Sequence, residues 1–309
     1  MRNLFIYISV LLIAAGTSLE APAQLSGVFY KVKFGDTLAA ARQKLEKECG
    51  STDLVVVKKP VYPLAKNSEK HLVCEEIKIG DDVIGEVVFS FGDDHLSLIE
   101  ARGGAVKALL SRASGESVSL ANYKAYFSDL MVAETSKDAV WLLSPESAHP
   151  NLFAWSNPYL PSNKGAKKTY QRSAKIPGLL KFGADIKLLM PLFEKQCPLL
   201  QVEEIKEPSL PSKPKKQTQL NCFGFEYAGF PRKIEAVFGD GVLELAWILT
   251  GKGEEDRVRR ALIKEYGKPE STSDSWESFK GWQIALRKDK PEVLLLSEKM
   301  VPFMKKYYQ

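Results

Sequence analysis

The sequence has few of the residues on which catalytic and metal sites are usually built. It contains three histidines and four cysteines in 309 residues. No two cysteines are spaced as C-x-x-C and no two histidines lie close together, so the pattern of a zinc site is missing. There is also no G-x-S-x-G nucleophile elbow and no G-x-x-x-x-G-K phosphate loop. We therefore expect no catalytic residues, no metal and no cofactor.

A long apolar segment is missing as well. Residues 1–23 combine the basic Arg2, an apolar run from 4 to 15 and an A-x-A site at 21–23, which is the pattern of a cleaved signal peptide. The run is shorter than the roughly 20 residues that a membrane helix needs, and no cysteine follows it for lipid attachment. We expect a signal peptide at 1–23, a periplasmic or secreted protein, and no stable membrane insertion after cleavage.

Acidic residues are absent between Glu146 and Asp185, where six basic residues fall. Residues 157–174 in this stretch are rich in Pro, Ser and Lys, and we expect them to form a solvated basic linker. A nucleic-acid partner would call for a basic surface with stacking aromatic residues, and export argues against such a partner. We therefore expect no binding of nucleic acid.

What the sequence does contain is an internal repeat. Four features recur at an interval of 147 or 148 residues. They are a Phe-Gly pair at 34 and 182, a first cysteine at 49 and 197, a second cysteine at 74 and 222, and a Phe-Gly-Asp triplet at 91 and 238. The repeat predicts two tandem domains of the same fold, at residues 24–156 and 175–309.

The four cysteines are expected to form two disulfides, because exported proteins mature in an oxidising compartment. Four cysteines allow three pairings. The repeat selects Cys49–Cys74 and Cys197–Cys222, since each copy then carries its own bridge. Closing a loop of this length stabilises a domain by roughly 3–4 kcal/mol on the chain-entropy estimate.

Apolar periodicity outlines the elements of each repeat. A short strand at 28–33 leads into a helix that Asp36 or Thr37 can cap, with the first cysteine at the end of that helix. A strand, a proline-containing loop, a three-strand meander, a second helix and two more strands are expected to follow. Their ranges are 54–57, 105–113, 130–133 and 138–146 in copy one, and 200–205, 219–227, 233–238, 242–249, 254–266, 282–286 and 291–299 in copy two. This order predicts an α+β fold, in which each domain is a helix-packed antiparallel sheet with one internal disulfide.

Three aromatic and three basic residues follow one another at the end of the first repeat: Phe153, Trp155, Tyr159, Lys164, Lys167 and Lys168. An exposed patch of this kind suits a protein interface, so these six are the candidate binding residues. The alternative is that segment 151–155 closes the edge of the first domain, as segment 302–308 would close the second. The repeat favours this structural interpretation.

One group of titratable residues invites an enzymatic interpretation. Asp93, Asp94 and His95 stand together at a turn between two strands. A hydrolase site there would need further side chains brought to it by the fold. A charged hairpin turn accounts for the group without any, and we favour the turn.

The order of these motifs resembles the tandem repeat of the β-lactamase inhibitor protein family. It is also similar to the small domain of the outer-membrane assembly lipoprotein superfamily. The residues that carry the resemblance are Phe34, Gly35, Asp36, Thr37, Cys49, Cys74, Phe91 and Gly92 in copy one, and Phe182, Gly183, Cys197, Cys222, Phe238, Gly239, Asp240 and Gly241 in copy two. This chain departs from the family in its long cysteine-bounded segment and in the helix and strands after each meander. The family's binding residues have no match here.

The resemblance implies a sheet surface, built from two domains, that grips a protein partner. We accordingly expect a non-enzymatic, exported protein-binding module, an inhibitor-like binder of another periplasmic or secreted protein. One alternative is a structural or assembly accessory of the cell envelope that contacts anionic surfaces through residues 164–181. Another is a hydrolase with an unrecognised site around Asp93, Asp94 and His95.

Overall fold

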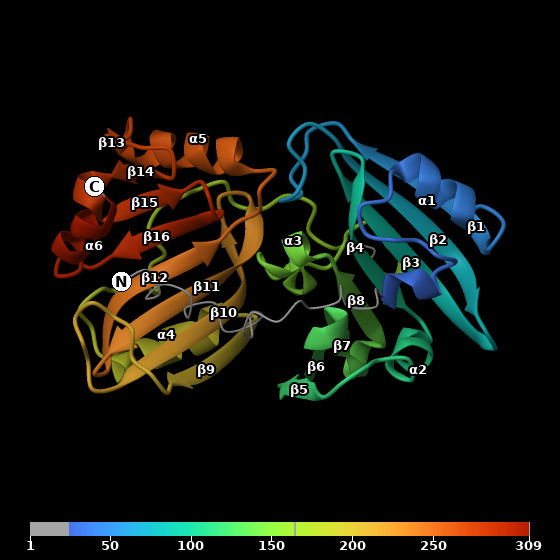
Figure 1. Cartoon of the computed structure of the whole chain (residues 1–309), viewed down its shortest axis with the longest axis horizontal. Coiled ribbons are helices and arrows are strands. Elements are labelled where there is room, and N and C mark those ends of the chain that lie inside the picture. The colour runs from blue at the N-terminus through green and yellow to red at the C-terminus, as the bar shows by residue number, and fades with distance from the viewer. Residues whose placement is uncertain (1–24, 164, 309) are drawn as a thin grey trace. The chain divides into compact units, whose positions relative to one another are not determined.

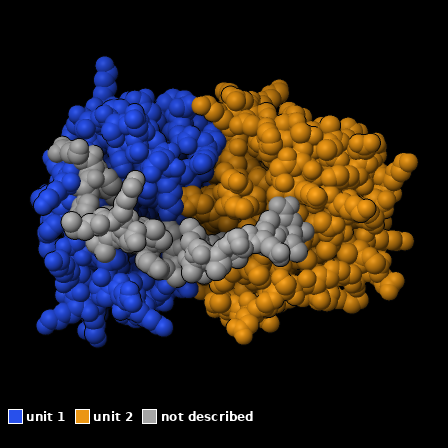
Figure 2. Space-filling model, viewed as in Figure 1, with its two compact units in different colours: residues 1–10, 169–309 blue, residues 11–168 orange. Residues whose placement is uncertain are grey.

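The structure is a computed structural model that describes residues 25–163 and 165–308. The signal peptide predicted at 1–23 and the candidate residue Lys164 lie outside the described residues. The chain divides into two compact units, and the boundary falls between Lys168 and Thr169, inside the segment expected to be a linker (Figure 2). We call residues 25–168 the N-terminal unit and residues 169–308 the C-terminal unit, and describe each by itself.

The N-terminal unit is built on one eight-stranded antiparallel sheet with the order β1-β2-β3-β4-β8-β7-β6-β5 (Figure 1). Two consecutive four-stranded meanders form it, and their last strands, β4 and β8, pair at its centre. The strands are β1 (Cys49–Val57), β2 (Glu69–Ile79), β3 (Asp82–Gly92), β4 (His95–Arg102), β5 (Ser117–Leu120), β6 (Tyr123–Tyr126), β7 (Met131–Glu134) and β8 (Ala139–Leu143).

The C-terminal unit repeats this topology strand for strand, in the order β9-β10-β11-β12-β16-β15-β14-β13. Its strands are β9 (Leu199–Ile205), β10 (Gln217–Tyr227), β11 (Phe230–Gly239), β12 (Val242–Leu249), β13 (Ser271–Thr272), β14 (Trp276–Phe279), β15 (Ile284–Arg287) and β16 (Glu292–Leu296). Disulfides join Cys49 to Cys74 and Cys197 to Cys222, with a sequence separation of 25 in each. The expectation of two antiparallel sheets with one disulfide in each is confirmed.

Strands dominate both units, and helices are few and short. The α-helices are α1 (Leu38–Leu45), α2 (Ala105–Leu110), α3 (Pro145–Ala148), α4 (Ile186–Gln196), α5 (Glu255–Tyr266) and α6 (Val301–Tyr308). The 3-10 turns are η1 (Leu25–Val28), η2 (Phe127–Asp129), η3 (Thr135–Lys137), η4 (Leu152–Ala154), η5 (Pro161–Asn163) and η6 (Lys280–Trp282). Thr37 caps α1 by accepting a hydrogen bond from the N–H of Ala40 at 3.2 Å, and Asp185 caps α4 from the N–H of Lys187 at 2.8 Å.

The repeated Phe-Gly motif fastens the segment before each helix to the sheet. Gly35 and Gly183 have φ angles of +86° and +83°, which favour glycine because a Cβ atom crowds the backbone there. The N–H of Gly35 donates to the carbonyl of Leu96 at 2.8 Å, and that of Gly183 donates to Leu243 at 2.9 Å. Each motif thus fixes the segment before its helix to the first residues of β4 or β12.

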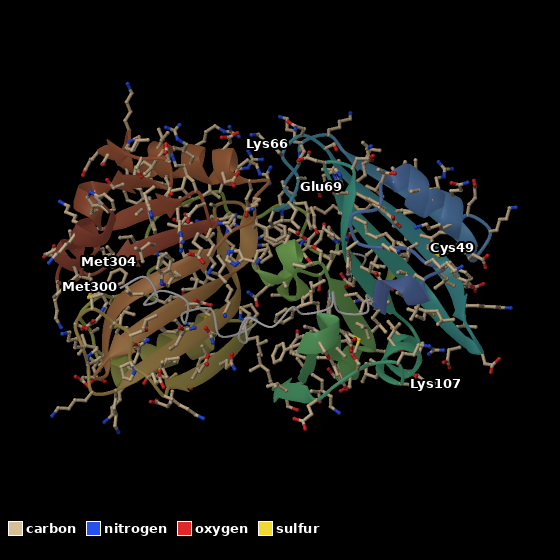
Figure 3. The ribbon with its side chains drawn as sticks, in the orientation of Figure 1. Cys49, Lys66, Glu69, Lys107, Met300 and Met304 are labelled. Atoms are coloured by element: carbon tan, nitrogen blue, oxygen red, sulfur yellow. A yellow bond between two sulfur atoms is a disulfide. The ribbon has the colours of Figure 1, made fainter. Side chains whose placement is uncertain are left out.

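The two faces of each sheet are covered differently. Ala41 and Leu45 of α1 belong to the same buried cluster as strand residues of the N-terminal sheet, and Leu189 and Phe193 of α4 correspond to them in the C-terminal unit. On the opposite face, segment 149–163 lies over the N-terminal sheet. The opposite face of the C-terminal sheet carries an apolar cluster that includes Met304 of α6 and Met300 just before that helix (Figure 3).

Several local predictions were wrong. Segment 28–33 is not a strand: η1 and a turn stand there, with positive φ at Tyr30 and Lys31. Phe29 and Val32 are both fully buried, and a spacing of three residues suits a turn of helix better than a strand. Cys49 begins β1 and does not end a helix. The pairs β5–β6 and β13–β14 were missed because such short segments, SVSL for example, carry no apolar period.

Candidate functional site

The most distinctive surface of the molecule is the free edge of β1. Each sheet has one long edge strand, β1 or β9, and one short edge strand, β5 or β13. An edge strand offers unpaired N–H and C=O groups to any other strand that approaches it. Natural sheets therefore keep their edges short or place charges on them. With nine residues, β1 is the longest of the four (Figure 1).

Apolar side chains line this edge. Leu54 is 42% exposed and Val56 is 61% exposed, although both sit in a regular ladder with β2. Leu54 pairs with Leu72, a residue of the helix-side core, so Leu54 and Val56 extend that apolar face to the rim of the sheet. Val55 pairs with His71 and points to the opposite face. Four successive apolar residues, from Leu54 to Val57, thus stand at the edge without a charge among them.

β9 occupies the same place in the C-terminal sheet but has a different surface. Val202 corresponds to Leu54 and is similarly exposed, at 52%. The next two positions carry Glu203 and Glu204 in place of Val55 and Val56. Successive side chains of a strand point to opposite faces, so both faces of this edge bear a carboxylate. Two successive carboxylates oppose pairing of β9 with another strand, whereas Asp53 is the single charged residue of β1.

The aromatic residues predicted to bind a partner are mostly buried. Phe153 and Trp155 belong to the core, and their rings lie 5.6 Å from Tyr123 and 5.7 Å from Tyr62. Tyr159 is half-buried, with its ring 4.7 Å from that of His71. These side chains cover one face of the N-terminal sheet and present no joint surface to a partner.

The basic candidates are more exposed than the aromatic ones. Lys167 is exposed, and the Nζ atom of Lys168 lies 5.4 Å from the ring of Tyr159. This cation–π contact joins a basic and an aromatic member of the predicted patch. Of the five candidates that the structure describes, Tyr159 and Lys168 are in contact, whereas Phe153 and Trp155 are buried.

Beneath the aromatic residues lies a buried polar network that the sequence did not reveal. The Nε2 atom of His71 is 3.0 Å from a carboxylate oxygen of Glu69, and its Nδ1 atom is 3.1 Å from the hydroxyl of Ser90. The side-chain amide of Asn157 donates to that hydroxyl at 3.0 Å. All four side chains are fully buried. Signals for the network were weak, because its members come from three separate segments of the chain.

The hydrogen bonds that join Ser90 to His71 and His71 to Glu69 resemble those of a catalytic triad. The surroundings of these residues nevertheless favour a structural role. The other oxygen of Glu69 accepts hydrogen bonds from the N–H groups of Val61 and Tyr62, at 2.6 and 2.9 Å (Figure 3). At the corresponding position of the C-terminal unit, Gln217 accepts from the two equivalent N–H groups, at 2.8 and 3.1 Å. Both side chains hold the loop between the first two strands of their sheet.

The protonation of Glu69 follows from these contacts. Burial alone raises the pKa of the carboxyl group, because it removes water from the charged form. The hydrogen bond and charge of His71 and the two backbone N–H groups outweigh burial, and the pKa falls below its ordinary value of 4.5. Glu69 is therefore ionised at neutral pH.

The same network ties the start of the expected linker to the sheet. The N–H of Asn157 donates to Glu100 at 2.9 Å, and the N–H of Ser162 donates to Glu86 at 3.0 Å. Burial raises the pKa of Glu100, which the neighbouring guanidinium of Arg102 opposes. Asn157 and Leu160 are buried, so this part of segment 157–174 is packed against the N-terminal sheet.

The turn at Asp93, Asp94 and His95 also has a structural explanation. The carboxylate of Asp93 accepts hydrogen bonds from the N–H groups of residues 66, 67 and 68 at 2.7–2.9 Å. Asp240 does the same for residues 215 and 216, at 2.9 and 3.0 Å. His95 is exposed, and Asp94 pairs with Lys70 at 3.2 Å. The aspartate of each Phe-Gly-Asp triplet thus anchors a loop.

Within the described part of the chain, no group of His, Cys, Asp and Glu side chains is arranged to hold a metal ion. No helix of that part is long and apolar enough to cross a membrane. Two disulfides are typical of extracytoplasmic proteins. Comparison of the chain with protein-family models, curated proteins and solved structures gave no match.

Proposed function

We propose that this chain is an exported, non-enzymatic protein-binding module that captures an extended segment of a partner protein along the edge of β1. Strand addition uses the unpaired backbone groups of an edge for affinity and the exposed side chains for selectivity. The observation that carries the proposal is the apolar run Leu54–Val57, with Leu54 and Val56 exposed, on a nine-residue edge strand.

The pairing on the inner side of β1 makes the edge a rigid template. Cys49 at its start is bound to Cys74 of β2, and residues from Cys49 to Val57 are in register with β2. A strand that adds to such a template loses its own freedom but orders no part of the receptor, which favours affinity. Ala41 and Leu45 of α1 share a buried cluster with residues of β2 such as Leu72.

The resemblance to tandem-repeat inhibitors of β-lactamase agrees with a protein partner. It also agrees with export, which the two disulfides support. The contacts of this chain, however, favour the edge of one sheet as the binding element, in place of a surface made by the aromatic residues. We propose no catalytic role for Ser90, His71 or Glu69.

The proposal is tested with a displayed library of random ten-residue peptides, selected on the secreted, disulfide-bonded chain. Peptides that bind by strand addition should lose roughly tenfold or more in affinity for the Val56→Glu variant, because a carboxylate on the edge is desolvated when a strand pairs with it. Fluorescence anisotropy of the labelled peptides gives the dissociation constants.

The matched control is Val202→Glu, which adds the same charge to the exposed valine of β9. Selected peptides should bind this variant as they bind the wild type. Peptides that bind the Val56→Glu variant as tightly as the wild type would contradict the proposal, and so would a selection that enriches no peptide.

A further inference from the structure

The loop between the first two strands of each sheet is rich in lysine. This loop covers residues 58–68 in the N-terminal unit and residues 206–216 in the C-terminal unit, and we call the two the lysine loops. The first has three lysines and no acidic residue, and the second has four lysines and one glutamate, so each has a net charge of +3. The lysines are Lys58, Lys59 and Lys66 in the first loop and Lys206, Lys213, Lys215 and Lys216 in the second.

Side chains of the neighbouring strands and turns hold each lysine loop in place. Glu69 and Gln217 accept hydrogen bonds from two backbone N–H groups in the first half of their loops. Asp93 and Asp240 accept hydrogen bonds from N–H groups in the second half. All seven lysines are exposed. The fold therefore presents these charges on a fixed backbone, and a ligand that binds them has little of the loop to order.

The lysines of the second loop stand close together without acidic partners. Lys206 follows the last residue of β9 and Lys216 precedes the first residue of β10, and those two end residues pair, so the two lysines lie side by side. None of the four lysines of this loop forms an ion pair with a carboxylate of the described residues. Like charges at such a spacing repel each other, and an anionic ligand would remove this repulsion.

The charge of the lysine loops is common to the two units, whereas the strands that lead into them differ. Lys58 and Lys206 lie 148 residues apart, which is the interval of the repeat. β9 carries two successive glutamates where β1 is apolar, yet the loop after each strand has the same net charge. The ligand should therefore be one that suits both loops.

The composition of the loops favours a diffuse anionic surface over a single anionic group. Arginine, whose planar fork binds one phosphate or carboxylate through two hydrogen bonds, is absent from both loops. The lysine ammonium group is a point charge on a flexible stem, which suits many charges whose positions are not fixed. Nucleic acid would call for exposed aromatic side chains on which bases stack, and the one aromatic residue of the two loops, Tyr62, is fully buried.

We propose that the lysine loops dock this protein on membranes that contain anionic phospholipids. The negative potential of such a membrane attracts basic segments, and each lysine close to the surface raises the affinity roughly fivefold. Attachment by charge alone is reversible and weakens as salt screens the charges. The inference is independent of strand capture by β1, because it uses the loops and not the edge.

Sedimentation of the disulfide-bonded chain with lipid vesicles tests this proposal. One set of vesicles contains phosphatidylcholine and phosphatidylglycerol in equal amounts, and the other contains phosphatidylcholine alone. At low ionic strength the wild type should sediment with the mixed vesicles and stay in solution with the neutral ones. Salt at roughly 0.5 M should release it from the mixed vesicles.

Two variants with the same net charge separate the loops from the charge of the whole protein. The loop variant replaces six lysines of the two loops by glutamine and should bind the mixed vesicles roughly a hundredfold more weakly than the wild type. The control variant replaces six other exposed lysines, three in each unit, and should lose less than about tenfold. The positions are Lys58, Lys59, Lys66, Lys213, Lys215 and Lys216 in the loop variant, and Lys47, Lys78, Lys124, Lys252, Lys264 and Lys268 in the control variant.

Equal losses in the two variants would overturn the inference, because they would show that net charge and not the loops attracts the protein to lipid. A wild type that does not sediment with the mixed vesicles would overturn it as well. Circular dichroism of both variants checks that they are folded. Peptide capture by β1 is measured without lipid, so neither outcome bears on the function proposed above.

Discussion

The two units share one topology and differ most at the edge strands β1 and β9. Both strands pair with the next strand in the same register, and β1 begins with a disulfide-bonded cysteine while β9 follows one. Where β1 has Val55 and Val56, β9 has Glu203 and Glu204. The two copies therefore share the backbone of this edge and differ in the side chains that it exposes.

The interior faces diverged in a comparable way. Glu100 of β4, which holds the N–H of Asn157, corresponds to Trp247 of β12 at the interval of 147 residues. A polar network under segment 149–163 in one unit thus stands against an apolar cluster with Met300 and Met304 in the other. The positions common to both units hold loops and turns: Gly35 and Gly183, Asp93 and Asp240. The two units therefore share the residues that anchor loops and turns, and they differ in the residues that cover the sheet.

The largest expected difference between the units concerns a buried ion pair of the C-terminal unit. Arg232 donates two hydrogen bonds to Glu254, and the corresponding residue of the N-terminal unit is Gly85. Replacement of Arg232 by Met removes the buried guanidinium that donates to Glu254, leaves Arg257 at 4.0 Å as its cation, and should destabilise the C-terminal unit by about 3–5 kcal/mol.

Hydrogen exchange measured separately on β9–β16 and β1–β8 shows whether this loss is confined to one unit. The double variant Arg232→Met with Glu254→Met should recover much of the lost stability, because no charge is then left buried. Equal losses in both units, or a double variant that is less stable than the single variant, would contradict this account of the pair.

The two disulfides are expected to contribute equally. Each spans 25 residues, so removal of either bridge should lower the unfolding free energy of its own unit by about 3 kcal/mol. Denaturant unfolding of Cys49→Ala with Cys74→Ala, compared with Cys197→Ala and Cys222→Ala, measures both values. A large difference between the two losses of unfolding free energy would contradict the expectation that the disulfides stabilise the two units equally.

Substitutions of Glu69 test whether it holds its loop in the same way as Gln217, by accepting hydrogen bonds from two backbone N–H groups. Glu69→Gln keeps an acceptor for the two backbone N–H groups and should cost less than about 1 kcal/mol, whereas Glu69→Ala leaves both groups unpaired and should cost about 2–3 kcal/mol. Thermal unfolding of the two variants at neutral pH decides between these values. Equal losses would mean that the charge, and not the hydrogen bonds, holds the loop.

The same variant carries a pH signature. Because the pKa of Glu69 is lowered in the folded chain, its stabilisation is present above the ordinary value of 4.5 and is lost as pH falls from there through the folded pKa. Glu69→Gln does not titrate. The stability difference between wild type and Glu69→Gln should therefore shrink as pH falls below 4.5, and a difference independent of pH would contradict the assignment.

The smallest expected effect is that of the edge substitution on stability. Val56 is mostly exposed, so Val56→Glu should change the unfolding free energy by no more than about 0.5 kcal/mol. Urea unfolding at neutral pH checks this. A loss of several kcal/mol would place Val56 in the folding core and remove the basis for using it as a surface probe.

Features with a local cause were predictable from the sequence. The Phe-Gly and Phe-Gly-Asp motifs, the cysteine pairs and the strand β12 (Val242–Leu249) were recognised because each depends on neighbouring residues or on the repeat. The polar network was not, because Glu69 of β2, Ser90 of β3 and Asn157 meet only after two strands and segment 149–163 are in place. The exposure of Leu54 and Val56 was likewise hidden, since an apolar strand looks the same in sequence whether it is central or at an edge.

Hydrogen exchange on β1 and β9, with and without a selected peptide, tests the central claim most directly. At a protein concentration where the chain is monomeric, the peptide should protect amides of Cys49–Val57 and leave those of Leu199–Ile205 unchanged. Protection of β9 to the same extent, or protection confined to the segment around Phe153 and Trp155, would contradict the assignment of β1 as the binding edge.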